Sequence, residues 1–277
     1  MSGARWAVRP VAGPGPAFER AHRLLEAEFG PRGELERRAV IEGWLGRPGW
    51  TRRDGLAQRY ALLEAVDADG TLAGARDCHL VVDETAALVV VYLAHVVVVP
   101  AHRRAGVGGL LREAPVALAR AALDELGAAG GDVLLAAEME PPRDGEPDTV
   151  GRLVAYGRAG FRAIDPRAFP YAQPDFRDPA VIDVPRPLPL LAVVRRLGHE
   201  DAVAIPAGLV AAYQRHLDAV FATHCRAEHL APRRERTLAA LAAAGPEVPL
   251  LPLPRDAADR AALSPLRLDP VTAAGHG

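Results

Sequence analysis

The chain has 277 residues, enough for one large domain or for one domain with an appendage. Its composition, 49% hydrophobic and 25% charged, is typical of a soluble globular protein. The formal net charge is −2 and no basic block dominates, which argues against nucleic acid as a main partner, because neutralising phosphates requires clustered lysine and arginine.

Neither a targeting segment nor a membrane span is expected. Residues 1–11 carry Arg5 and Arg9 and lack the apolar stretch of a signal peptide. The longest apolar run, residues 86–100, is rich in valine and shorter than the roughly 18–20 residues that a spanning helix needs. Cys78 and Cys225 are most simply two free thiols in a reducing compartment. We therefore expect a cytoplasmic protein that binds no membrane.

The first half of the chain predicts two helices and a run of strands. Residues 5–11 alternate weakly, as a strand does, and helical spacing of apolar residues follows. The sequence Asp-Ala-Asp-Gly at residues 67–70 predicts a tight turn between two strands. The expected helices cover residues 17–29 and 34–45, and the expected strands cover residues 58–66, 71–82 and 86–99. The last strand is long, so we expect it to be buried and to contain a bulge.

The second half predicts one crossover unit and a different C-terminal segment. We expect helices at 107–126, with Pro115 inside, and at 150–158, and strands at 132–139, from 161 and within 187–197. Ala-rich amphipathic helices should follow at 206–230 and 234–244, and residues 246–277 read as a poorly ordered tail or a strap. The order indicates an α+β fold with one parallel crossover, divided into a domain 1–197 and a helical extension 198–277.

The clearest chemical signal lies between the long strand and the helix from residue 107. Pro100 ends the strand, and the sequence Arg103-Arg104-Ala105-Gly106-Val107-Gly108-Gly109 leads into the helix. A helix N-terminus offers unpaired N–H groups and partial positive charge, and glycines let a phosphate approach the backbone. The spacing fits neither a Rossmann fingerprint, which needs a third glycine where Leu111 stands, nor a Walker loop. The sequence therefore predicts a pyrophosphate cradle.

This segment resembles the GNAT superfamily signature Val-x-Pro-x-x-Arg/Gln-x-x-Gly-x-Gly/Ala, whose fixed places are held by Val98, Pro100, Arg103, Gly106 and Gly108. The resemblance implies the acyl-CoA N-acyltransferase fold, a mixed and mostly antiparallel sheet with a splayed central strand flanked by helices. It implies that the backbone of Val97, Val98 and Val99 pairs with the pantetheine of coenzyme A like an added strand. The pyrophosphate contacts would then come from Arg103, Arg104, Ala105, Gly106, Val107, Gly108 and Gly109.

A second segment, Tyr156-Gly-Arg-Ala-Gly160-Phe161, is similar to the family's Tyr-x-x-x-Gly-Phe motif. By resemblance, Tyr156 would stand near the thioester sulfur and protonate the departing thiolate. Thr149 occupies the place of an asparagine common in the family, so we assign it to the cofactor side as a departure from the pattern.

The general base has no single candidate. Relatives often carry it on the long strand, where this chain has Tyr92, Ala94 and His95 and no carboxylate. We read His95 as a core histidine and place Tyr92 on the substrate side. The end of the next strand offers Glu138 and Glu140, which alternation puts on one face, so either can serve as base or merely solvate the strand end.

Two further groups of residues have a predicted place on the acceptor side or in the structure. The sequence Tyr171-Ala-Gln173-Pro174 resembles a stretch of uncharacterised GNAT members, which implies that Tyr171 and Gln173 line the acceptor side; the alternative is a simple turn. His224, Cys225 and His229 are metal-like residues without a second pair to complete a tetrahedral set, and no metal is expected.

The resulting hypothesis is an N-acetyltransferase that moves an acetyl or short acyl group from acetyl-CoA to a primary amine, small or peptidic, by direct attack in a ternary complex. One alternative is a GNAT-fold module that binds acyl-CoA as a sensor without turnover. A further alternative is a nucleotide-binding module. The extension from residue 198 either caps the acceptor cleft or forms a homodimer, and the sequence leaves both open.

Overall fold

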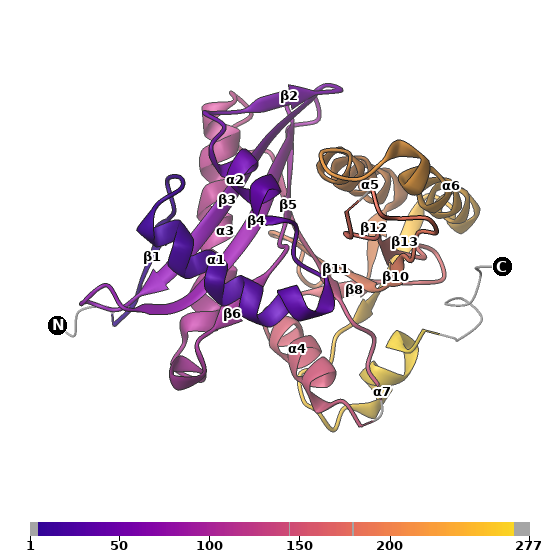
Figure 1. Ribbon diagram of the computed structural model, residues 1–277. Helices are drawn as coiled ribbons and strands as arrows, with labels where there is room; N and C mark the ends of the chain where they lie inside the picture. Colours follow the sequence, from indigo (N-terminus) through magenta and orange to yellow (C-terminus); the bar gives the residue numbers. More distant parts are fainter. Residues whose placement is uncertain (1–4, 144, 179, 269–277) are drawn as a thin grey trace. The chain divides into compact units, whose positions relative to one another are not determined.

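The computed structural model describes residues 5–143, 145–178 and 180–268 (Figure 1). The chain divides into two compact units, Met1–Val133 and Leu134–Gly277, and the boundary falls inside strand β7 (Asp132–Met139). The predicted α+β class is confirmed, because each unit combines mostly antiparallel strands with flanking helices. Among the described residues, no helix has both the length and the apolar content needed to cross a membrane.

The first unit contains an antiparallel sheet built on one long hairpin. Its strands run in the order β1 (Ala7–Pro10), β3 (Leu56–Val66), β4 (Leu72–Asp83) and β5 (Leu88–Tyr92), with β2 (Thr51–Arg53) on β3 and β6 (Val96–Val98) on β4. The predicted turn between β3 and β4 is confirmed. The Asp67 carboxylate closes it by accepting hydrogen bonds from the amides of Asp69 and Thr71 at 3.0 and 2.8 Å.

Helices cover both faces of this sheet, and the period-two pattern of β3 separates the two cores. Leu62 packs with Phe18 of α1 (Pro16–Phe29) and Ile41 of α2 (Arg38–Leu45). The next residue, Leu63, packs with Leu111 of α3 (Val107–Glu125) on the other face. A short 3-10 helix, η1 (Gly30–Arg32), follows α1, and α2 starts later than the predicted residue 34.

The long strand predicted over residues 86–99 is two strands, β5 and β6, which both pair with β4. His79 is opposite Tyr92 and Arg76 is opposite Val96, so three residues on this side face two on β4. That mismatch is a bulge, as predicted, and it interrupts the ladder. At the bulge the His95 amide donates to the side-chain carboxylate of Asp77 on β4, at 2.7 Å, and not to a backbone carbonyl of that strand.

The second unit has its own antiparallel strands. Their order is β7, β11 (Leu191–Arg196), β8 (Arg162–Ile164), β13 (Glu247–Pro252) and β12 (Ala204–Pro206), and β9 (Ala172–Gln173) pairs separately with β10 (Leu188–Pro189). The expectation that residues 246–277 lack regular structure is wrong for β13, whose two prolines hide the strand pattern. Strands from the predicted segments 1–197 and 198–277 thus share one sheet.

The helices of the second unit are α4 (Pro147–Arg158), α5 (Ala207–Phe221), α6 (Ala227–Ala244) and α7 (Arg260–Leu263), followed by η3 (Ser264–Leu266). The helix predicted to reach residue 230 stops at Phe221, and α6 continues past Pro232. After β13 the chain runs along α4 in close contact with it. A Cβ on Gly157 of α4 would lie 2.4 Å from the Pro254 oxygen. The strap alternative therefore holds for this stretch.

Candidate active site

The predicted cradle is a glycine turn at the start of α3. Arg104 and Gly106 have left-handed backbones, with φ of 64° and 88°, and Gly106 caps the helix without a side-chain hydrogen bond. The N–H groups of Val107 and Gly108 belong to the first turn, where no intrahelical acceptor exists. A Cβ on Gly106 or Gly109 would meet no atom within 4 Å. Amides, helix dipole and open space therefore coincide at this turn, which suits an anion.

Strand β6 leads into this turn with one edge available. Within residues 5–133, β6 pairs with β4 alone, in the register Ala75 opposite Val97 and Gly74 opposite Val98. The Val99 amide donates inward to the Ala73 carbonyl at 2.9 Å, so alternation turns the backbone groups of Val98 away from β4. Among the described residues, only Arg103 donates to the Val98 oxygen, from Nε at 3.4 Å. The edge of β6 can thus accept an extended, amide-bearing ligand.

Two residues that sequence reasoning missed support this turn. The Trp6 indole donates Nε1–H to the Ala105 oxygen at 3.2 Å and packs edge-on to His102, with ring centroids 4.9 Å apart. Gly74 lets β4 approach β6, because a Cβ there would lie 2.7 Å from the Val97 oxygen. Gly74 sits inside a strand pattern, a signal for close backbone approach, whereas nothing local marks Trp6.

A buried polar cluster lies under α1 and α2 of the same unit. The Asp77 carboxylate, which is fully buried, accepts from Tyr60 Oη at 3.0 Å and contacts His95 Nδ1 at 3.1 Å. His95 Nε2 lies 3.0 Å from the Glu34 carbonyl oxygen. Burial alone lowers the pKa of His95, but the Asp77 charge and hydrogen bond outweigh it and raise that pKa to about 10. The reading of His95 as a core histidine agrees with these contacts.

Among the described residues, Glu36, Asp77 and His95 form the one group whose ligand atoms, within 4.8 Å of one another, suit a metal ion. Both nitrogens of His95 already have partners, so the imidazole would have to give one up to bind a metal. Tyr92 ends β5 beside this cluster and stacks on His79 with centroids 6.1 Å apart. Tyr92 is 3% exposed, so its side chain is part of the buried interior and not of the surface.

The two candidate bases lie at the end of β7 in the second unit, and each has a partner. Tyr171 Oη donates a hydrogen bond to the Glu138 carboxylate, and Arg152 of α4 donates to the Glu140 carboxylate. Tyr156 lies on α4, is 6% exposed and packs edge-on to Phe161 with centroids 4.8 Å apart.

The remaining predicted residues have structural contacts as well. Thr149 is buried near the start of α4 and its hydroxyl donates to the Glu146 carbonyl at 2.8 Å, so it helps to close the first turn of its own helix. Gln173 is 8% exposed on β9, and Tyr171 stacks on Phe169 with centroids 5.9 Å apart. Burial and the nearby Glu138 charge raise the pKa of Tyr171 well above its usual value, so its hydroxyl stays a donor.

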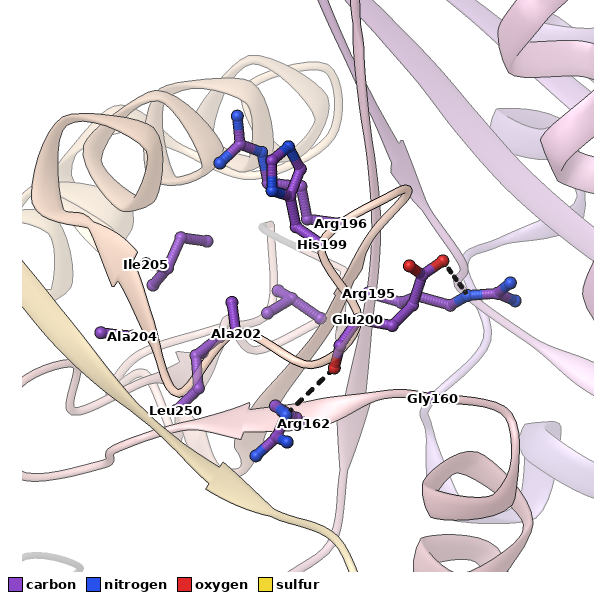
Figure 2. Close-up of a pocket in the computed structure, with 11 residues that line it drawn as sticks. Gly160, Arg162, Arg195, Arg196, His199, Glu200, Ala202, Ala204, Ile205 and Leu250 are labelled. Atoms are coloured by element: carbon purple, nitrogen blue, oxygen red, sulfur yellow. Dashed lines mark hydrogen bonds and ion pairs between the residues drawn. The ribbon is translucent and has the colours of Figure 1, made fainter.

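Figure 2 shows a separate cavity in the second unit, bordered by β8, β11, β12 and β13. Arg162 and Arg195 enclose Glu200: Arg162 Nε donates to its carbonyl at 3.2 Å and Arg195 Nε to its carboxylate at 3.4 Å. Arg196 and His199 lie together on another side (Figure 2). None of the residues predicted to act in catalysis or binding lines this cavity.

No protein-family model and no curated protein matches the chain. Solved structures that align with it include acetyltransferases of the GNAT family. One is a GCN5-related glucosamine N-acetyltransferase region of a fungal multi-domain β-N-acetylglucosaminidase: 20% identity, TM-score 0.40, covering 60% of this chain and 18% of that one. A GCN5-related N-acetyltransferase from Kribbella flavida has 21% identity, TM-score 0.36 and coverage of 70% and 98%. A putative GNAT acetyltransferase from Desulfovibrio desulfuricans is 18% identical, with a TM-score of 0.38. The alignment covers 69% of this chain and 98% of that one. At these scores the likeness decides neither activity nor substrate.

Proposed function

We propose that the chain is an acyl-CoA-dependent N-acyltransferase that moves an acetyl or short acyl group to a primary amine. The observation that carries this proposal is the continuous element from β6 into α3. An open strand edge suits the amides of pantetheine, and the turn at Gly106 directly after it offers unpaired N–H groups for a pyrophosphate. Coenzyme A has these two groups in this order, and a nucleotide without pantetheine uses only the second.

The reaction would proceed by direct attack in a ternary complex. The amine nitrogen bonds to the thioester carbonyl carbon, the C–S bond breaks, and the electron pair leaves with sulfur. The ammonium proton of the adduct passes to a carboxylate, and Glu138 and Glu140 remain the candidates. Tyr156 gives its proton to the thiolate. Backbone N–H groups of the valine strand would polarise the carbonyl oxygen.

Binding and turnover test the proposal in sequence. Calorimetric titration of the full chain with acetyl-CoA should give a Kd in the micromolar range, and an amine panel should then release free CoA, followed by mass spectrometry. In Gly108→Val, the added Cβ meets only Val98 Cγ2, at 3.6 Å, so the fold is kept while the side chain crowds the turn. Loss of roughly 10- to 100-fold in affinity is expected from displaced charge-assisted hydrogen bonds. Unchanged affinity would contradict the proposal.

A second candidate function is a module that binds acyl-CoA without turnover. The pairing of Glu140 with Arg152 and of Glu138 with Tyr171 favours it, because a carboxylate already bound to a donor is a weaker base. Tight acetyl-CoA binding with no CoA release for any amine would select this candidate. Binding of NAD but not of CoA would select a nucleotide-binding module instead.

A further inference from the structure

The second unit contains a buried polar cluster, between β7, α5 and α6, that the proposed reaction does not yet use. Arg233 of α6 is 7% exposed, and its Nη2 donates to Asp218 of α5 at 2.5 Å. The guanidinium carbon lies 5.6 Å from the Tyr171 ring centroid and 5.3 Å from that of Phe221. The Arg233 guanidinium thus makes cation–π contacts with two aromatic rings. One of these rings belongs to Tyr171, whose hydroxyl donates to Glu138.

Several polar atoms of this cluster are buried without a hydrogen-bond partner among the described residues. They are Nε and Nη1 of Arg233, Oη of Tyr213, Oε1 of Gln214, Oδ2 of Asp218 and Oγ1 of Thr237. More than nine-tenths of buried polar groups in folded proteins are hydrogen-bonded, because a polar group that leaves water without gaining a partner destabilises the fold. These unmet atoms on α5 and α6, beside the Arg233–Asp218 pair, indicate that a polar molecule belongs there.

The unmet atoms also specify the kind of molecule. Arginine presents only donors, so the free Nε–H and Nη1–H groups require an acceptor, and a carboxylate or phosphate oxygen is the strongest. Glu138 and Asp218 add acceptors that suit an ammonium group. The cluster therefore combines complementary groups for an amine that also bears an anion.

We propose that Arg233 binds the anionic group of the acceptor, so that the substrate is an amine carrying a carboxylate or a phosphate. This inference rests on the proposed N-acyltransferase function and gives the helical segment from residue 198 a role in acceptor recognition. Arg233 supplies the anion contact, and it packs on the ring of Tyr171, whose hydroxyl donates to the Glu138 carboxylate.

Matched acceptor pairs test the inference on the full chain. One pair is glycine and glycinamide, and the other is phosphoethanolamine and ethanolamine. The members of each pair differ mainly in the anion. The first pair tests for a carboxylate and the second for a phosphate. The wild type should prefer the anionic member of one pair by roughly 10- to 100-fold in KM, or in Kd by calorimetry. Arg233→Met should remove that preference, and Arg233→Lys should restore part of it.

Arg236→Met is the matched control, since Arg236 lies on the same helix and is exposed. Circular dichroism melting checks that each variant folds, and Arg233→Met combined with Asp218→Asn avoids a lone buried charge. Equal binding of both members of each pair by the wild type, or an Arg233→Met variant that keeps the preference, overturns the inference and assigns the unmet atoms to buried water. Amine binding measured without acetyl-CoA decides this even if the chain fails to bind acetyl-CoA, which would refute the proposed function alone.

Discussion

Replacing Asp77 with asparagine removes the charge that keeps His95 protonated inside the first unit. The folded pKa of His95 is about 10 against an ordinary 6.5; burial opposes this shift, but the charge and hydrogen bond of Asp77 outweigh it. Burial raises the pKa of Asp77, yet the His95 charge and hydrogen bonds hold it below 3.8. A pKa unit corresponds to about 1.4 kcal/mol, so the pair is worth on the order of 3–5 kcal/mol, as for other buried pairs.

The sign of the pH dependence follows from proton counting. Between pH 6.5 and about 10 the folded protein keeps a proton on His95 that the unfolded chain releases. The free energy of unfolding therefore falls as pH rises through this window, by up to about 1.4 kcal/mol per pH unit. The contribution of His95 is complete below pH 6.5 and absent above about pH 10. At the acid end, the contribution of Asp77 is present above pH 3.8 and is lost as pH falls through its lowered pKa.

Urea unfolding followed by circular dichroism, repeated between about pH 6 and pH 10, measures this effect. Asp77→Asn should be less stable than the wild type by about 3–5 kcal/mol near neutrality, and the gap should close towards pH 10. Asp69→Asn, in the exposed turn before β4, is the control, and its free energy of unfolding should stay close to that of the wild type at every pH. A gap that stays constant over the whole range would show that His95 is neutral in the folded protein, and the reasoning would fail.

Three further predictions concern the cradle and the reaction. Gly74→Val should lower stability by about 1–3 kcal/mol, seen as a drop in Tm, because its Cβ would sit 2.7 Å from a backbone oxygen of β6; an unchanged Tm would contradict the close packing. Trp6→Phe should weaken CoA binding about 5-fold in calorimetry by removing the hydrogen bond to Ala105 at 3.2 Å; equal affinity would leave Trp6 a packing residue only. Tyr156→Phe keeps the ring and should lower kcat by about 100-fold with little change in KM for acetyl-CoA, measured by steady-state CoA release; a full kcat would exclude Tyr156 as the acid.

Local rules account for what the sequence predicted correctly. Pro100, Gly106 and the apolar spacing after residue 107 act over a few residues, so strand end, turn and helix α3 all follow from them. The hairpin of β3 and β4 is likewise set by its own turn, at Asp67. Motif spacing added the cofactor residues near Gly106 by resemblance, and their role in binding stays a prediction.

Contacts between distant residues decided the rest. The interruption of the valine strand depends on Asp77, 18 residues before His95, and the brace on the turn comes from Trp6, 99 residues before Ala105. Strand β13 pairs with β12 on one side and with β8 on the other, and both partners are distant in sequence.

The sequence by itself therefore determined the fold class, most element positions and the glycine turn before α3, because those follow from backbone propensity and short-range spacing. Only the tertiary structure revealed the charged pair of Asp77 and His95 and the unmet donors of Arg233. A side chain's burial and its partners depend on residues that fold beside it from elsewhere in the chain, and no local pattern records them.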